Sequence, residues 1–395
     1  MNAANELGDR IEAARGLDTR ALTELLLDPG SDTTARLAAA ADETMRCEVG
    51  DAVYFRGLLE FSNVCRADCL YCGIRRSNVH VHRYTIDEAD VLAAARHCAE
   101  AGYGSMTLQA GERRDAAFIE YVCRLLEGIK AETRSPTLPD GLGITLSVGE
   151  QSPDTYRRFF EAGAHRYLLR IETSSPELFA RIHPPRQRYA DRRAALDAVR
   201  DAGFQVGTGV MIGLPGQTAG DLAADIRFVS REEIDMIGMG PYLPHAETPM
   251  GRGRRLSGQE RSWLLHQSLR MIALTRIVLP DVNIAATTAL QTLDGRGRER
   301  ALQGGANVVM PVVTPASVRA GYQLYDGKAC VDEDRSVCAG CMSGRVAWTR
   351  RPVAINRWGD APHFARRMHE RSRHEALPHE RAFHERPPQE RRHGE

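Results

Sequence analysis

The sequence lacks a long hydrophobic run, because no stretch approaches the roughly 18 apolar residues of a membrane-spanning helix. Residues 1–20 mix acidic and basic side chains and contain no apolar core of a secretory signal. Net charge is also missing, since 52 Lys and Arg residues balance 52 Asp and Glu residues. A balanced chain has no overall attraction to nucleic acid or to anionic lipid. These absences predict a cytoplasmic protein that binds neither nucleic acid nor membrane.

The composition is that of a folded protein. Of the 395 residues, 43% are hydrophobic and 26% are charged, which excludes disorder of the whole chain. Between residues 53 and 310, short apolar runs alternate with helical patterns eight times, and the runs are continuous, as in parallel strands covered on both faces. We therefore expect an α/β fold, a (β/α)8 barrel of the TIM type. An open doubly wound sheet is the alternative, since alternation alone does not reveal closure.

Four segments are predicted along the chain. Residues 1–50 have helical periodicity, residues 51–312 form the barrel, and residues 313–349 form a short extension that contains cysteines. Residues 350–395 are rich in Arg, His, Glu and Pro and hold six of the thirteen histidines. We expect this tail to be disordered because it has too few apolar side chains for a core, and metal binding by its histidines is the alternative.

Nine cysteines in a reducing compartment favour metal or redox chemistry over disulfides. Six of them form two groups, whereas Cys98 and Cys123 lie at apolar positions of helical patterns and are predicted to be small buried hydrophobes. The groups are Cys65, Cys69 and Cys72, and Cys330, Cys338 and Cys341, and the remaining cysteine is Cys47.

The first group has the spacing C-x3-C-x2-C and directly follows the first predicted strand. Three thiolates this close can hold one metal site. A structural zinc ion would need a fourth ligand, which His80 or His82 could supply. The other possibility is a [4Fe–4S] cluster that leaves one iron open to an exogenous ligand. The spacing favours the iron–sulfur cluster, which can pass electrons to a bound molecule, whereas zinc is redox-inert.

With the aromatic Tyr71 before its last cysteine, this motif resembles the signature of radical S-adenosylmethionine (SAM) enzymes. The resemblance implies that the open iron binds the methionine part of SAM, and that electron transfer into the sulfonium yields a 5′-deoxyadenosyl radical. Residues 207–218 are rich in glycine but lack the Gly-Lys-Ser/Thr of a Walker loop. They are similar to the SAM-binding strand of this superfamily.

Over residues 45–342 the chain is similar to the HydE family, the radical SAM maturases of [FeFe]-hydrogenase, which are related to biotin synthase and methylornithine synthase. This implies a small organometallic or amino-acid-derived substrate, an iron–cysteine carbonyl/cyanide synthon. It also implies an electron donor such as ferredoxin or flavodoxin, and other hydrogenase maturases as partners. The resemblance rests on residues 57–63, 72–76, 108–112, 145–150, 167–173, 213–218, 240–245, 283–290, 305–311 and 322–325.

The same resemblance implies the site residues. Glu172 would contact the ribose or amino group of SAM and Arg192 its carboxylate, for which guanidinium offers a bidentate fork. A solvated charge run is the alternative for Arg192. No side chain is expected to act as nucleophile or general base. The implied cofactor contacts are Gln109, Thr145, Glu172, Arg192, Met211, Gly213 and Met236, and the implied substrate cavity adds Arg170, Thr287, Thr288 and Tyr322.

The second group, Cys330-x7-Cys338-x2-Cys341, resembles the accessory iron–sulfur site of some HydE proteins. It would hold a [2Fe–2S] or [4Fe–4S] cluster, with a zinc knuckle as the alternative. Because other family members lack this site, we expect it to be dispensable for SAM cleavage.

Three other functions remain open. The chain could be a carbon-skeleton mutase like methylornithine synthase, or a sulfur inserter like biotin synthase. Biotin synthase would be expected to bind a sacrificial cluster through cysteines on barrel strands, and none of the nine cysteines is placed there. A non-enzymatic iron–sulfur scaffold is the third, but it would not need Glu172, Arg192 and the glycine strand.

Overall fold

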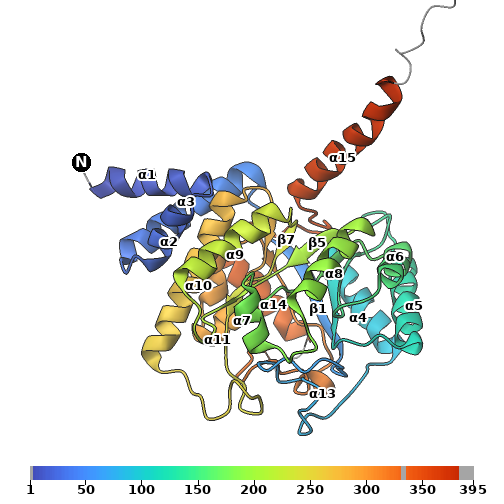
Figure 1. Cartoon of the computed structure of the whole chain (residues 1–395). Coiled ribbons are helices and arrows are strands. Elements are labelled where there is room, and N and C mark those ends of the chain that lie inside the picture. Colours follow the sequence, from blue (N-terminus) through green and yellow to red (C-terminus); the bar gives the residue numbers. More distant parts are fainter. Residues whose placement is uncertain (1–2, 331–334, 382–395) are drawn as a thin grey trace, which may run out of the picture.

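Eight parallel strands form a barrel in the computed structural model (Figure 1), which describes residues 3–330 and 335–381, with side chains for residues 6–330 and 340–372. Asn307 N donates to Ile284 O at 3.0 Å and Ala286 N to Val308 O at 2.9 Å, which links the first and last strands of the sheet. The prediction of a (β/α)8 barrel is confirmed. The strands, in sheet order, are β10 (Val308–Val309), β1 (Tyr54–Ser62), β2 (Ser105–Ala110), β3 (Gly143–Ser147), β4 (Arg166–Leu168), β5 (Gln205–Thr208), β7 (Met236–Ile237) and β9 (Asn283–Ile284).

The apolar runs are continuous because both faces of each strand are covered. In β1, Phe61 faces outward and stacks on Phe118 of the surrounding helices, with ring centroids 6.0 Å apart, whereas Leu58 packs inside the barrel against Val312. The apolar runs at residues 205–212 and 236–240 each break after a short barrel strand, β5 or β7, and continue in a small separate two-stranded ladder. Its strands are β6 (Met211–Ile212) and β8 (Gly240–Pro241).

Helices surround the barrel, and most of them lie where the helical periodicity predicts them, although residues 176–182 and 288–293 are helical without having been predicted. Their starts carry side-chain caps: Thr218 with Asp221 and Ser257 with Glu260 form capping boxes. No helix in the described part of the chain is long and apolar enough to cross a membrane. The helices are α4 (Glu88–Glu100), α5 (Ala116–Glu132), α6 (Pro153–Glu161), α7 (Pro176–Ile182), α8 (Tyr189–Asp201), α9 (Ala219–Arg231), α10 (Gly258–Val278), α11 (Thr288–Leu293), α12 (Gly297–Leu302), α13 (Ala316–Arg319) and α14 (Arg335–Trp348).

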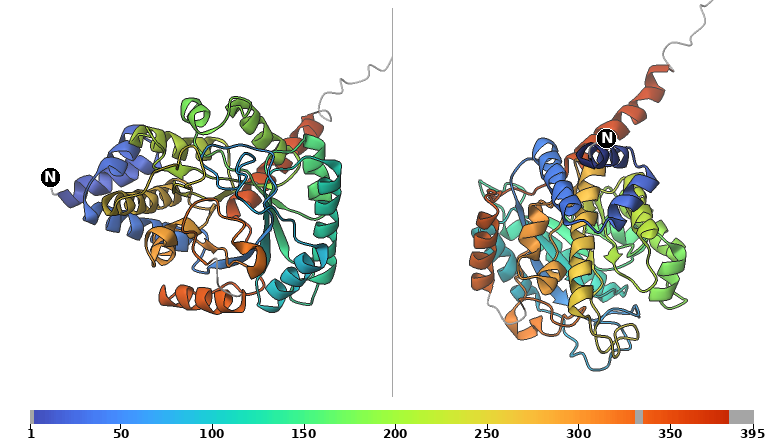
Figure 2. Two further views of the ribbon diagram at one scale, coloured as in Figure 1. Left: turned by 90° about the horizontal axis from the view of Figure 1, so that it is seen from below. Right: turned by 90° about the vertical axis from the view of Figure 1, so that its left-hand side faces the viewer.

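The N-terminal segment is helical, as predicted, and lies on one side of the barrel against α9 and α10 (Figure 2). Arg270 of α10 fixes the turn before the third helix by donating to the backbone oxygens of Leu26, at 3.4 Å, and Gly30, at 2.8 Å. Its helices are α1 (Ala3–Arg15), α2 (Thr19–Leu27) and α3 (Ser31–Glu48).

The expectation that residues 350–395 form a disordered tail is wrong for the first part of this segment. Residues 351–367 pack across the N-terminal end of the barrel, where Asp360 forms an ion pair with the fully buried Arg166. His363 and Arg367 both contact the buried Asp235, at 2.8 and 2.7 Å. The high content of charged residues in this segment predicted exposure to solvent, but several of these side chains form ion pairs with buried residues of opposite charge. From there α15 (Pro362–Arg381) projects away from the barrel (Figure 1).

Candidate active site

The first cysteine group lies in the loop after β1, at the C-terminal end of the barrel, where the active sites of such barrels are built. Its thiols are free and half-buried. An ion pair of 3.0 Å between Arg75 and Asp68 holds the loop together, and Gly73 N donates to Leu324 O at 3.0 Å. A Cβ atom on Gly73 would lie 2.1 Å from the Gln323 backbone oxygen. Glycine after the last cysteine is therefore required for this close contact.

Each of two thiols has a hydrogen-bond donor outside the loop. Glu112 N lies 3.3 Å from Cys65 Sγ, and Gln187 Nε2 lies 3.6 Å from Cys69 Sγ. Burial raises the pKa of Cys69 to about 11, although the nearby Arg192 opposes the shift. Burial also raises the pKa values of Cys65 and Cys72. Buried thiols of this kind become thiolates when a metal group binds them.

The donor set fits a cluster better than a single ion. Among residues 6–330 and 340–372, no three His, Cys, Asp or Glu side chains lie close enough together to hold one metal ion. His80, the possible fourth zinc ligand, has a side chain that is 71% exposed and lies 3.7 Å from Glu247. The three thiols of the loop therefore fit a group with three separate points of attachment, such as a [4Fe–4S] cluster.

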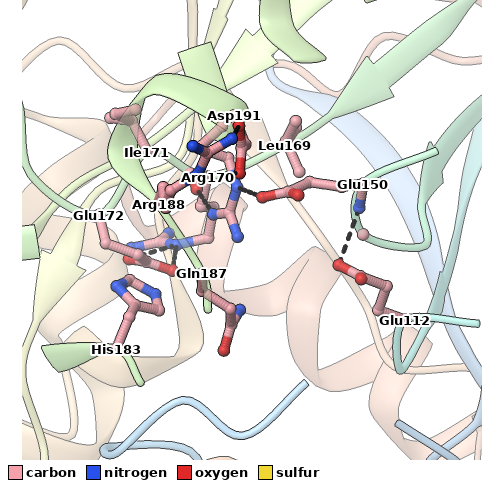
Figure 3. Close-up of polar contacts among 12 residues, drawn as sticks. Glu112, Glu150, Leu169, Arg170, Ile171, Glu172, His183, Gln187, Arg188 and Asp191 are labelled. Atoms are coloured by element: carbon pink, nitrogen blue, oxygen red, sulfur yellow. Dashed lines mark hydrogen bonds and ion pairs between the residues drawn. The ribbon is translucent and has the colours of Figure 1, made fainter. Parts of the chain in front are cut away.

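Glu172 and Arg170 follow β4, and Figure 3 shows their side chains in contact with each other. Glu172 adopts a left-handed backbone conformation, with φ of 66°. Its carboxylate accepts a hydrogen bond from Tyr71 OH at 3.2 Å and from Arg170 Nε at 3.1 Å. Arg170 also donates to the backbone oxygens of Val210 and Gly238 at the ends of the next two strands. The buried carboxylate is thereby fixed beside the loop, and the unusual backbone angle is consistent with a functional position.

Arg192 comes from α8 and is buried, so it is not part of a solvated charge run. Its Nε donates to Glu150 Oε1 at 2.6 Å, and its Nη1 donates to Arg170 O. Burial disfavours the charge of Arg192, but Glu150, Tyr71 and Cys69 together outweigh it and the pKa of Arg192 is raised. Within the described side chains, Nη2 has no hydrogen-bond partner. One N–H edge therefore remains for an anionic ligand such as a carboxylate.

Two carboxylates beside this group were assigned no role from the sequence. Glu112 follows β2 and Glu150 follows β3, and Glu112 Oε2 accepts a hydrogen bond from Glu150 N at 3.0 Å (Figure 3). Burial raises the pKa of Glu112. Their position directly after strands is a signal that could have identified them.

Gln187 and His183 were also missed. They lie in the connection between α7 and α8, which carries no recognisable motif. His183 stacks on Phe179 with ring centroids 3.9 Å apart, and burial lowers its pKa to about 3, so that it is neutral.

Thr145 and Met236 lie deeper, in the wall of a small, mainly apolar cavity inside the barrel. Thr145 Oγ1 is buried and has no hydrogen-bond partner in the described part of the protein, so a ligand could use it. Gln109 is half-buried on β2, beside Glu60 of β1. These three predicted contacts are therefore spread along the interior and are not gathered at the cysteine loop.

The remaining predicted contacts lie around the mouth of the barrel. Met211 is buried in a small apolar cluster against which Tyr71 packs. Gly213 has φ of 85°, and its N–H donates to Gln217 Oε1 at 2.7 Å, so this amide is already used within the protein. Thr287 lies at the N-cap position of α11, but its hydroxyl donates to Met239 O at 3.3 Å and makes no capping hydrogen bond.

Thr288 begins α11 and is half-buried. Tyr322 is buried, and Lys328 Nζ donates to its backbone oxygen at 2.9 Å. Lys328 also forms an ion pair with the buried Glu60 of β1. This pair attaches the segment before the second cysteine group to the barrel.

In the second group, Cys330 is half-buried and Cys341 is exposed on α14. The side chain of Cys338 lies outside the described residues, so the prediction of a shared site for the three thiols stays a prediction.

Comparison with known proteins identifies the relatives of this chain. A model of the radical SAM superfamily matches residues 59–229. The chain is similar to the [FeFe] hydrogenase maturase subunit HydE of Thermotoga maritima, with 41% identity over 302 residues, which cover 76% of this chain and 82% of that protein. It is 25% identical to 3-methylornithine synthase of Methanosarcina barkeri over 337 residues, or 85% of this chain and 91% of that protein.

Among solved structures, methylornithine synthase (PylB) superposes with a TM-score of 0.72 at 24% sequence identity, covering 89% of this chain and 98% of that chain. At that identity the likeness shows a shared fold.

Proposed function

The chain belongs to the HydE family of radical SAM proteins, and on that premise we propose that it is a maturase of [FeFe]-hydrogenase. The observation that carries the proposal is the meeting of three half-buried thiols with the buried Glu172 and Arg192 at one end of the barrel. When bound, the reduced [4Fe–4S] cluster supplies the electron that splits SAM into methionine and the 5′-deoxyadenosyl radical.

The side chains of the site bind and orient. Cys65, Cys69 and Cys72 would hold the cluster, and Arg192 Nη2 would bind the carboxylate of SAM. Glu172, fixed by Tyr71 and Arg170, would accept hydrogen bonds from the ribose or amino group. None of them needs to transfer a proton. Their contribution is positioning and the exclusion of water, since the cofactor performs the chemistry.

We assign the substrate to the barrel interior. Thr145 Oγ1, which has no hydrogen-bond partner in the described part of the protein, offers a hydroxyl toward a small polar molecule such as an iron–cysteine carbonyl/cyanide synthon, whereas Arg170 already binds Glu172 and two backbone oxygens. None of the eight cysteines that the structure describes is in a disulfide, which suits a reducing compartment such as the cytoplasm.

The alternative functions are less well supported. A sulfur inserter would be expected to have cysteines on the barrel wall, but Cys47, Cys98 and Cys123 lie on α3, α4 and α5 outside it. A scaffold that only carries a cluster has no use for the buried Arg192 beside the thiols. A carbon-skeleton mutase shares the cofactor site, and the higher identity to HydE favours the maturase.

The test is SAM cleavage by anaerobically reconstituted protein with dithionite, followed by hydrogenase activation. We expect 5′-deoxyadenosine from the wild-type protein and none above background from Cys72→Ala. Adding the wild-type protein to a maturation mixture that lacks only this component should restore hydrogen evolution by an unmatured [FeFe]-hydrogenase. Equal 5′-deoxyadenosine production by both proteins would contradict the enzyme function, and cleavage without restored hydrogenase activity would favour the mutase.

We also propose that Cys330, Cys338 and Cys341 hold an accessory iron–sulfur cluster of the [2Fe–2S] or [4Fe–4S] type. The triple Cys→Ala variant should lose the iron of that cluster and keep SAM cleavage within about twofold of wild type. Iron that stays at the wild-type level in the triple variant would contradict this assignment.

A further inference from the structure

A polar pocket opens to solvent directly beside the cysteine loop. It has a volume of about 270 Å³ and lies between this loop, the segments after β2 and β3, and the connection from α7 to α8. Figure 3 shows Glu112, Glu150, Gln187 and Asp191 around it. Its lining residues of positive charge are Arg66, Arg76, Arg114 and Arg186.

Only single residues separate this pocket from two of the thiols, because the same residues line the pocket and contact the sulfur atoms. Glu112 lines the pocket, and its N–H lies 3.3 Å from Cys65 Sγ. Gln187 lines it as well, and its Nε2 lies 3.6 Å from Cys69 Sγ. Electron tunnelling falls steeply with distance, so a redox centre seated on this pocket would have a short path to a cluster held by these thiols.

The acidic residues of the pocket are paired with arginines, whereas most of its arginines have no ion-pair partner among the described residues. Its carboxylates are neutralised, since Glu150 pairs with Arg192 and Arg114, and Asp191 pairs with Arg188 at 2.6 Å. By contrast, the guanidinium groups of Arg66, Arg76 and Arg186 are exposed and make no hydrogen bond or ion pair with any residue that the structure describes. Three exposed cations without an ion-pair partner among the described residues attract a surface of negative charge, although Arg76 also acts electrostatically on the nearby Asp68.

We propose that this pocket is the docking site of the electron donor, a small acidic protein with a low-potential one-electron centre. The proposal rests on the proposed function, because it assigns an electron source to the same cluster. In the step itself, the carrier loses one electron and the oxidised cluster held by Cys65, Cys69 and Cys72 gains it, and no bond or proton moves. Arg66, Arg76 and Arg186 provide the positive charge that orients the acidic carrier, so that its redox centre lies over Glu112 and Gln187, next to the thiols.

The experiment compares two charge-reversed double variants of the reconstituted enzyme. In Arg76→Glu/Arg186→Glu, two of the free cations of the pocket are reversed. The matched control, Arg134→Glu/Arg357→Glu, reverses two exposed arginines near the N-terminal end of the barrel. An acidic ferredoxin serves as the probe. Its Kd for each enzyme is measured by titration calorimetry at low salt and at 0.5 M NaCl, and 5′-deoxyadenosine is measured with ferredoxin or with dithionite as reductant.

We expect the pocket variant to raise the Kd of ferredoxin at least tenfold at low salt, and the difference to shrink at 0.5 M NaCl because salt screens exposed charges. Its ferredoxin-driven activity should fall, whereas its dithionite-driven activity should match wild type, since dithionite needs no docking surface. An unchanged Kd, or equal weakening in the control variant, would overturn the proposal. If the wild-type enzyme produced no 5′-deoxyadenosine with dithionite, the proposed function would fail, while the binding comparison would still decide the docking site.

Discussion

Tyr71 OH donates a hydrogen bond to Glu172 Oε1 at 3.2 Å and so joins the cysteine loop to the end of β4. Burial raises the pKa of Tyr71, so the phenol stays protonated. The other neighbour of the hydroxyl is His183 Nε2, at 3.5 Å. His183 Nδ1 lies 3.0 Å from Phe179 O, and a carbonyl can only accept, so the ring proton is on Nδ1 and Nε2 has none to give. Nε2 is thus a second acceptor beside the hydroxyl, and the single proton of Tyr71 is directed toward Glu172 because Oε1, at 3.2 Å, is closer than Nε2, at 3.5 Å.

Tyr71→Phe should weaken SAM binding without loss of the cluster. The substitution removes one of the two groups that fix Glu172, and a hydrogen bond to a charged group contributes about 1.5 kcal/mol, which is roughly tenfold in Kd. Iron content and the spectrum of the cluster should not change. The control is Tyr121→Phe, which removes a tyrosine hydroxyl bonded to Ile86 O away from the site. A SAM affinity equal to wild type in equilibrium dialysis of Tyr71→Phe would show that Glu172 needs no help from this hydroxyl.

Gln187→Leu should lower the reduction potential of the cluster. An N–H donor to a ligand sulfur stabilises the reduced, more negative state, so its removal makes reduction harder. A hydrogen bond of about 1 kcal/mol corresponds to about 40 mV for a one-electron couple. The measurement is a redox titration followed by electron paramagnetic resonance. Gln217→Leu is the control, because this side chain supports the turn at Gly213 and does not contact the thiols. Potentials that agree within error would exclude a role of Gln187 in tuning the cluster.

The barrel and the cysteine loop could be predicted because their signals are local. Continuous apolar runs specify strands that are buried on both faces, and the C-x3-C-x2-C spacing places three thiols within one short loop. Gln187 could not be predicted in this way, since it reaches Cys69 from 118 residues away and no motif marks it. Which residues follow a strand can be read from sequence, as for Glu112. Which side chain of one loop contacts a residue of another loop, as Gln187 contacts Cys69, depends on tertiary packing and cannot be read from the sequence.

The C-terminal segment was mispredicted for a different reason. Composition describes how much apolar surface a segment can bury, but residues 351–367 are held mainly by charged and polar contacts. Asp360 accepts from Gln205 Nε2 at 2.7 Å and pairs with Arg166, and Asn283 Nδ2 donates to Gly359 O at 2.8 Å. A charge-rich segment can be ordered if buried groups of opposite charge pair with its side chains. Here such groups, Arg166 and Asp235, lie at the N-terminal end of the barrel.

Asp360→Ala should destabilise the protein strongly. The fully buried Arg166 would lose its carboxylate, and breaking such a pair costs about 3–5 kcal/mol when one charge is left unpaired. Because Asp360 is itself partly exposed, we expect a value at the lower end, about 3 kcal/mol, in urea unfolding of the reconstituted protein. Deleting residues 373–395 is the control and should leave the midpoint unchanged, since the contacts of Asp360, His363 and Arg367 with the barrel all precede the deleted residues. Equal stability of Asp360→Ala and wild type would mean that the segment does not support the barrel.

Asp225 should make the stability of the protein depend on pH near neutrality. This residue of α9 is buried, and its Oδ1 accepts from Ser174 N at 2.6 Å just after β4, while Oδ2 has no hydrogen-bond partner among the described residues. Burial raises the pKa of Asp225 from 3.8 to about 7. The folded state therefore binds the proton more tightly than the unfolded state. Its stabilising effect is complete below about pH 4 and is lost as the pH rises through 7.

Asp225→Asn should remove this dependence. Asn keeps an oxygen that accepts from Ser174 N and carries no charge at any pH. Linkage predicts that the wild type loses roughly 2 kcal/mol more than the variant between pH 5.5 and pH 8. Urea unfolding of both reconstituted proteins at these two pH values provides the measurement. Because every other titrating group is shared, the difference between the two curves isolates Asp225. Parallel curves would mean that the Asp225 carboxyl is ionised in the folded protein throughout this range, and that the loop after β4 tolerates a buried negative charge.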